Sequence, residues 1–344
     1  MKGRTIILDH IDGREAAALM VDGKLSDILV AGDAPAPGTI YRAIADRPVK
    51  GQGGMFLKTP DGSAFLRQVK GLSPGQPLLV QVTGYAEEGK AIPVTQKVLF
   101  KSRYAIVTPD APGLNISRSI RDDDMRDELM VVAKEVMEGR EMGLILRSCC
   151  AVASPEDIAD DVEEMAALAD TVINDESTEM EMLVAGDLPH VLAWRDWTEV
   201  AEIVTQAGGF EDHGVLDALE AAAGTFESFG NSGGMYIEPT RALIAVDVNT
   251  GNDASLAAGV KANMLCARRL PQALRVRGLA GQITLDLAPM PKKDRRAFEV
   301  ALRASFRTDE IETALVGWTP LGHYELQRKR VRLPLSEVLA GVFE

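Results

Sequence analysis

Short apolar segments recur about every ten residues between Thr39 and Phe100, and glycine and proline turns separate them. The five segments have the length and the residue types of β-strands and lie near 39–48, 53–60, 63–69, 77–86 and 90–100. Five strands this short shield their apolar sides from water when they close into a small barrel, for which the OB-fold is the common five-stranded form. The sequence therefore predicts an OB-fold barrel here.

Another group of strands precedes the predicted barrel. Residues 4–10 and 15–30 alternate apolar and polar side chains, and Asp12-Gly13 and Asp22-Gly23 supply turns between them. We therefore expect three short antiparallel strands. The Gly- and Pro-rich run at 32–38 ends this pattern and marks a boundary.

The pattern becomes helical after Asn115. Acidic residues at 122–124 and Gly139 flank an amphipathic segment, and the apolar residues that follow it predict a strand at 142–148. Ser154 followed by Pro155 is typical of a helix start, and that helix is expected to reach Asp170. Further helices are predicted near 196–207 and 213–223.

Strands alternate with helices from Gly233 onward. Strands are predicted at 235–240, 242–250 and 281–288, and helices at 254–275 and 292–306. This alternation is typical of an α/β unit.

Two aspartates stand near the ends of apolar strands in this α/β unit. Asp247 and Asn249 are two residues apart and so share one face of a strand, and Asp286 has a similar place in the later strand. A carboxylate buried at such a place costs several kcal/mol unless it is paired or bound to a metal.

A divalent cation would relieve the repulsion between two such carboxylates. Donors that are only oxygen favour Mg²⁺ or Mn²⁺, and no zinc is expected. Such an ion can activate water and stabilise charge on a phosphodiester. The alternative is that Asp247 and Asp286 cap the helices that follow their strands.

Charge is unevenly distributed along the chain, whose net charge is −14. Residues 241–344 hold 16 Lys and Arg against 11 Asp and Glu, which leaves 21 and 40 for residues 1–240. The last third is therefore the candidate polyanion-binding part, with solvated basic helices as the alternative. Its basic residues are Arg268, Arg269, Arg275, Arg277, Lys292, Lys293, Arg295, Arg296, Arg328, Lys329, Arg330 and Arg332.

The predicted barrel also contains residues suited to single-stranded nucleic acid. Phe56 and Phe65, with Lys58 and Lys90, could form a face on which bases stack. Packing of the two rings in the core is the alternative.

Several other kinds of protein are disfavoured. The four histidines are scattered, the three cysteines form no CxxC pair, and no P-loop or dinucleotide motif occurs. No apolar run is long enough to span a membrane, and acidic residues occupy the start where a signal peptide would be apolar. A cytoplasmic location is therefore expected.

Three segments together resemble the ribonuclease E/G family: SGGMYIEPTRALIAVDVNTG, KANMLCARRLPQALRVRGLAGQITLDLAPM and LGHYELQRKRVRLPLSE. Their order and spacing are more specific than any one of them. The resemblance implies that Asp247 and Asp286 hold Mg²⁺ (or Mn²⁺), that the ion activates the attacking water, and that Asn249 orients Asp247 or the scissile phosphate.

The resemblance also implies an α+β, multi-domain organisation. It divides the chain into a ribonuclease H-like part at 1–37, an inserted S1-like OB-fold barrel at 38–102, a 5′-sensor-like domain at 103–187, a second ribonuclease H-like part at 188–226 and an α/β DNase I-like catalytic domain at 227–344. Within the sensor-like domain, Arg147 and Ser148 match the positions that bind a 5′-monophosphate, for which a guanidinium and a hydroxyl are suitable partners.

Three features depart from the family pattern. The chain ends at Glu344, before the place where larger members have a zinc-binding CxxC, so any homodimer is expected to lack a zinc link. Residues 308–312 are acidic where a basic phosphate contact is expected, and Ala288-Pro289 replaces a more common Ile-Asp pair.

We expect a Mg²⁺-dependent endoribonuclease that cuts single-stranded RNA in RNA processing or decay, with Arg275 and Arg277 helping to hold the strand. A non-catalytic RNA-binding protein with the same fold is the main alternative. A hydrolase of small phosphate esters is disfavoured, because a small substrate needs neither a barrel nor an extended basic face.

Overall fold

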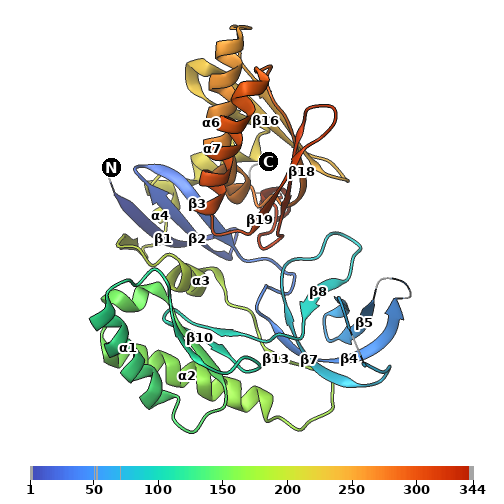
Figure 1. The fold of residues 1–344 in the computed structure, drawn as a ribbon, viewed down its shortest axis with the longest axis vertical. Helices are drawn as coiled ribbons and strands as arrows, with labels where there is room; N and C mark the ends of the chain where they lie inside the picture. The colour runs from blue at the N-terminus through green and yellow to red at the C-terminus, as the bar shows by residue number, and fades with distance from the viewer. Residues whose placement is uncertain (1–2, 50, 52, 70, 341–344) are drawn as a thin grey trace. The chain divides into compact units, whose positions relative to one another are not determined.

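The computed structural model describes residues 3–49, 51, 53–69 and 71–340 (Figure 1). The chain forms two compact units, one from Met1–Gly32 with Ala201–Glu344 and the other from Asp33–Val200. Within the described ranges, no helix has the length and apolar character needed to cross a membrane.

A closed five-stranded barrel opens the unit Asp33–Val200, and this confirms the predicted OB-like barrel. The strand order is β4-β5-β6-β8-β7, and pairing of β7 with β4 closes it. Alternate side chains such as Met55, Leu57 and Val80 fill the interior. The strands are β4 (Ile40–Val49), β5 (Gly54–Thr59), β6 (Gly62–Leu66), β7 (Pro77–Val82) and β8 (Ile92–Thr95), and β13 (Glu181–Val184) also pairs with β4.

A second sheet in this unit packs against two long helices. Its order is β11-β12-β10-β9, formed by β9 (Phe100–Lys101), β10 (Ala105–Thr108), β11 (Leu114–Ile116) and β12 (Gly143–Leu146). The helices are α1 (Asp123–Val136) and α2 (Pro155–Ile173). As predicted, Ser154 caps α2, where its side chain accepts a hydrogen bond from the Asp157 amide.

The region around residue 200 corrects one prediction. Instead of a helix at 196–207, helix α3 (Pro189–Asp196) ends early and Glu202–Val204 forms strand β14. This strand pairs in parallel with β1, whose edge satisfies the backbone hydrogen bonds of β14. The pairing is distant in sequence, so local periodicity could not reveal it.

The other unit begins with the predicted three antiparallel strands, β1 (Arg4–Ile11), β2 (Arg14–Val21) and β3 (Lys24–Val30). Their turns place Asp12 and Asp22 at φ 49° and 50°, each followed by a glycine with positive φ. Two such residues form the hairpin turns that match strand twist. The apolar face of these strands packs with α4 (Gly209–Asp212), α5 (Val215–Ala223) and α8 (Leu335–Val338).

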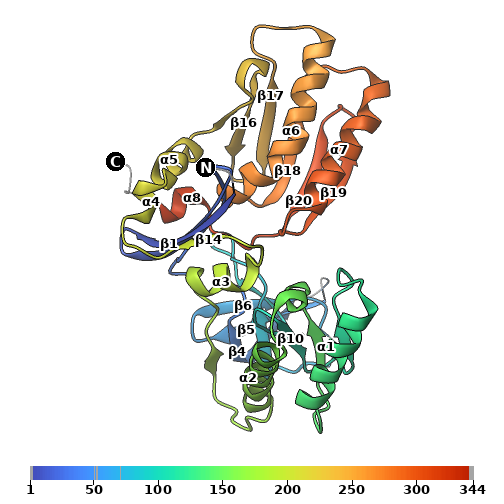
Figure 2. The same cartoon turned by 90° about the vertical axis from the view of Figure 1, so that its left-hand side faces the viewer.

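A six-stranded sheet completes this unit, in the order β15-β16-β17-β18-β20-β19. Helices α6 (Leu256–Val276) and α7 (Arg295–Arg307) cover one face of the sheet (Figures 1 and 2). The strands are β15 (Phe226–Ser228), β16 (Gly234–Pro239), β17 (Ile244–Asn249), β18 (Gly281–Asp286), β19 (Thr313–Trp318) and β20 (Tyr324–Arg328). The predicted strands and helices of the α/β unit are present, whereas the β19–β20 hairpin was not predicted. The assignment of the α/β part as DNase I-like and of its partner as ribonuclease H-like stays a prediction.

Two carboxylates that are shielded from water, those of Asp309 and Asp27, form ion pairs with arginines of this unit. Asp309 pairs with Arg275 and, at 2.5 Å, with Arg328, while Asp27 of β3 lies 3.3 Å from Arg332. Burial lowers the pKa of Arg328 although Asp309 opposes that shift. The acidic segment 308–312 therefore contains an internal partner for arginines.

Replacing Asp309 by alanine tests this ion-pair cluster. The change leaves Arg275 and Arg328 without their shared carboxylate, and we expect it to lower the free energy of unfolding by about 3–5 kcal/mol. Urea denaturation measures the loss, with exposed Asp217→Ala on α5 as the control. A loss under about 0.5 kcal/mol, typical of a surface change, would show that the cluster contributes little.

Candidate functional site

Asp247 and Asp286 lie side by side at the ends of neighbouring strands. Strands β17 and β18 pair in parallel, and their register sets Asp247 directly opposite Asp286. Neighbouring strands are about 4.8 Å apart, so the two carboxylates share one small region. Asn249 follows two residues later, at the same end of β17. The structure thus brings together the three residues that the sequence selected.

Both aspartates are exposed, which differs from the burial that the sequence argument assumed. Val246 and Val248 face the α6 side of the sheet, so Asp247 between them points to the opposite face. The pKa of Asp247 is raised, first by partial desolvation, then by the charge of Asp286 and that of Glu238. Repulsion between like charges is therefore present without deep burial.

The end of β17 is shaped by a close approach of two backbones. The Asn249 side-chain oxygen accepts a hydrogen bond of 2.7 Å from the Gly251 amide. Gly233, at φ 86°, lies so near that a Cβ there would stand 1.9 Å from the Asn249 carbonyl oxygen. Only glycine suits this position, which immediately precedes β16.

A buried asparagine fixes the segment that follows Asp286. Asn263 on α6 is fully buried; its side-chain nitrogen donates to the Ala288 carbonyl at 2.8 Å, and its oxygen accepts from the Ala288 amide at 3.0 Å. Gly259, one turn earlier, allows Pro289 to approach the helix. The strand-end pattern does not point to Asn263, although a polar residue within the apolar stripe of a predicted helix is a usable signal.

His323 is a second residue that the sequence reasoning missed. Its Nδ1 atom lies 3.3 Å from Oδ1 of Asp286. The contact depends on the β19–β20 hairpin, which was not predicted. Alternating burial of Tyr324, Leu326 and Arg328 shows the period of a strand that the sequence contained.

An open hollow of about 390 Å³ adjoins the Asp286 end of β18. Arg295 lies over the Trp318 ring there, with its guanidinium carbon 4.3 Å from the ring centroid. The lining residues are Leu256, Leu287, Ala288, Pro289, Met290, Pro291, Arg295, Trp318 and Gly322.

The carboxylate pair fits a hard divalent cation. Mg²⁺ is commonly bound by one or two carboxylates and keeps several water ligands. Across the part of the chain that the structure describes, no three His, Cys, Asp or Glu side chains form a metal-binding group. The two carboxylates that could hold such an ion are those of Asp247 and Asp286, with water completing its shell.

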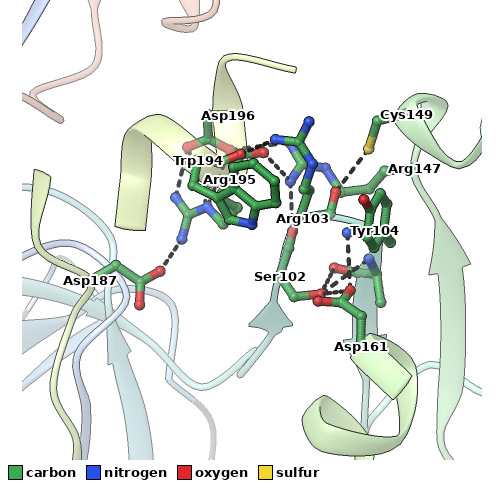
Figure 3. A network of polar contacts seen from close by, with 11 residues as sticks. Ser102, Arg103, Tyr104, Arg147, Cys149, Asp161, Asp187, Trp194, Arg195 and Asp196 are labelled. Atoms are coloured by element: carbon green, nitrogen blue, oxygen red, sulfur yellow. Dashed lines mark hydrogen bonds and ion pairs between the residues drawn. The ribbon is translucent and has the colours of Figure 1, made fainter. Parts of the chain in front are cut away.

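Arg147 already has partners within its own unit (Figure 3). Its guanidinium donates to the carbonyls of Ser102 at 2.6 Å and Arg195 at 2.9 Å, and lies 3.1 Å from the Asp196 carboxylate. Burial tends to raise the pKa of Asp196, but Arg195 and then Arg147 outweigh it and lower that pKa. Ser148 is exposed at the start of the short 3₁₀ helix Ser148–Val152.

The structure brings together only some of the residues predicted to form a stacking face on the barrel. Phe56 and Phe65 are opposite each other on β5 and β6 with ring centroids 5.3 Å apart, and both are half-buried. Since Met55 and Leu57 point into the barrel, Phe56 and Lys58 share its outer side. Lys90 lies in a turn beyond these strands and pairs with Glu87.

The predicted RNA contacts at Arg275 and Arg277 do not match their surroundings. Arg275 belongs to the Asp309 cluster, and Arg277 is buried and lies 3.2 Å from Glu227. Both arginines neutralise carboxylates inside the unit, so a structural role replaces the expected surface role. Their partners are far away in sequence and could not be identified from it.

Comparison with known proteins gives consistent similarities. A family model described as Ribonuclease E/G family matches residues 100–205 and 193–331, more than half of the chain. Ribonuclease G of Salmonella typhimurium (strain SL1344) is 24% identical over 309 residues, which cover 78% of this chain and 62% of that protein. Ribonuclease E of Nostoc sp. (strain PCC 7120) is 24% identical over 374 residues, with 92% and 54% covered. The chain thus spans between about half and three fifths of the length of these relatives.

Replacing Asp247 by asparagine tests the carboxylate pair without any reaction. Because the pKa of Asp247 is raised in the folded chain, its ionisation opposes folding at neutral pH. Asp247→Asn is therefore expected to raise the free energy of unfolding at pH 7 by less than about 1 kcal/mol. The gain should disappear as the pH falls through the raised pKa, and urea denaturation over a pH series measures it.

Mg²⁺ provides the second readout of the same variant. Calorimetry should show that Mg²⁺ raises the Tm of the unsubstituted chain and of Asp217→Asn, but not that of Asp247→Asn. An equal rise in all three proteins would mean that Asp247 does not hold the ion.

Proposed function

The chain belongs to the ribonuclease E/G family, and from this we propose that it is an endoribonuclease that cleaves single-stranded RNA in RNA processing or decay. One observation carries the proposal: the parallel register sets Asp247 against Asp286, and the pKa of Asp247 is raised, first by partial desolvation and then by the charge of Asp286. Two carboxylates in such a position favour a bound divalent cation, which phosphodiester hydrolysis can use.

We place Mg²⁺, or Mn²⁺, at Asp247 and Asp286. When bound, the ion would supply a water of lowered pKa and offset charge on the phosphate. The side-chain oxygen of Asn249 is engaged by Gly251, so its nitrogen is the atom suited to donate to a phosphate oxygen. Asn263 steadies the backbone after Asp286, and His323 contacts the Asp286 carboxylate. Hydrolysis of this kind is expected to leave a 5′-phosphate on the downstream product.

Contacts with the RNA strand are proposed on the barrel as well. The paired rings of Phe56 and Phe65, with Lys58 on the same outer side, combine stacking and positive charge as single-stranded RNA requires. Arg47 lies over the Phe56 ring, with its guanidinium carbon 5.0 Å from the ring centroid. This arginine adds a cation beside the aromatic pair.

Cleavage of a short fluorescent RNA tests the proposal. Wild-type chain is expected to cut it with Mg²⁺ and not with EDTA. Asp286→Asn should slow cutting by more than about 100-fold, beyond the usual effect of losing an outer-shell partner of a metal. RNA binding in EDTA should stay unchanged, and Asp217→Asn is the matched control.

Two results would contradict the proposal. Cutting by Asp286→Asn at the wild-type rate would remove this site from the reaction. A folded wild-type chain that binds RNA without cutting it would favour the non-catalytic RNA-binding alternative.

We also propose that recognition of an RNA 5′-phosphate, at Arg147 and Ser148, is weak. A phosphate must compete with Asp196, which already pairs with the Arg147 guanidinium. The rates for 5′-monophosphate and 5′-hydroxyl RNA should therefore differ by less than about fivefold, the effect of an ion pair worth under about 1 kcal/mol. Paired cleavage assays measure the ratio, and a ratio above about 100 would show that Asp196 yields fully to the phosphate.

A further inference from the structure

An exposed aromatic pair extends the row of side chains that contains the two aspartates. On the six-stranded sheet, Phe226 is opposite Tyr236, Tyr236 is opposite Asp247, and Asp247 is opposite Asp286. Cross-strand partners point to the same face of a sheet. The four side chains therefore follow one another across β15, β16, β17 and β18, on the face opposite the helix-packed side.

The two rings are held in place but not covered. Their centroids are 4.9 Å apart with planes at 47°, and Phe226 and Tyr236 remain 44% and 40% exposed. The Phe226 ring lies against Gly234, where an added Cβ would stand 2.4 Å from it. Gly234 thus provides the space that seats Phe226, and Phe226 in turn limits the positions open to Tyr236.

The charges beside the pair restrict what can bind there. Glu238 stands on the same face of β16 as Tyr236, and its charge contributes to the raised pKa of Asp247. A phosphate would be repelled at this point, whereas an uncharged nucleobase would not. Aromatic rings bind bases by stacking whatever their sequence.

We infer that Tyr236, supported by Phe226, is a stacking subsite for the RNA base next to the phosphate that is cut. This inference rests on the proposed function, because it takes Asp247 and Asp286 as the centre of cleavage. Tyr236 is one strand from Asp247, which places its ring within one nucleotide of that centre. The subsite orders the chain of bases while the carboxylates act on the backbone.

Fluorescent bases test the subsite without any cutting. A series of ten-nucleotide RNAs, each with 2-aminopurine at one position, is bound to the wild-type chain in EDTA. We expect strong quenching at one position or two adjacent ones, its loss in Tyr236→Ala, and its retention in Tyr236→Phe, which keeps the ring. Val316→Ala, at an exposed apolar position on the opposite edge strand β19, is the control and should quench as wild type does.

A cleavage assay then tests coupling between the ring and the base. Removing the base at the quenched position should slow wild-type cutting by about tenfold, as expected for one stacked base. Tyr236→Ala should cut the RNA that lacks this base at the same rate as the intact RNA. Unchanged quenching in Tyr236→Ala would overturn the inference. So would a slowing by base removal that is as large in Tyr236→Ala as in the wild type, because the ring and the base would then act independently.

The two readouts separate failure of the subsite from failure of the proposed function. Quenching that depends on Tyr236 in a chain that never cuts would support base stacking at Tyr236 and contradict the nuclease. Cutting that is indifferent to Tyr236 would contradict the subsite alone. If Tyr236→Ala instead changes only the sedimentation of the chain, the aromatic pair is a contact between copies and the inference is wrong.

Discussion

The parallel pairing of β17 with β18 is the constraint on which the candidate site depends. A parallel pair needs a long crossover, and α6 supplies it while covering the apolar side of both strands. The same helix contributes Asn263, whose amide replaces a missing backbone partner at Ala288. The β17–α6–β18 crossover therefore sets the strand register, the helix packing and the position of Asp286.

Charge has two different uses in this chain. Arg275, Arg328 and Arg332 neutralise carboxylates that are shielded from water, and removing either partner would leave a costly unpaired charge. Asp247 and Asp286, by contrast, stand together without an arginine partner among the ion pairs of the described residues. Within the same unit, the carboxylates that stabilise the fold are thus paired with arginines, whereas the two that we propose for the chemistry are not.

Local patterns in the sequence were sufficient to predict much of the fold and to identify the central pair of aspartates. Strand alternation, Asp-Gly turns and the Ser154 cap each act within a few residues, so the barrel strands, hairpins and helices could be predicted. Contacts between distant segments could not: β14 extends the β1 edge, and His323 reaches Asp286 through an unpredicted hairpin. The predicted burial of the aspartates was wrong because alternation along β17 and β18 turns Asp247 and Asp286 away from the core.

The most direct test of the central claim is to map the metal itself. Fe²⁺ can take the place of Mg²⁺, and with ascorbate and peroxide it generates hydroxyl radicals that cut the polypeptide near the bound ion. Mass spectrometry of the fragments should find cuts around 247–249 and 284–288, which disappear with excess Mg²⁺ and in Asp247→Asn. Cuts confined to other segments, or cuts at these positions that persist in Asp247→Asn, would contradict the account.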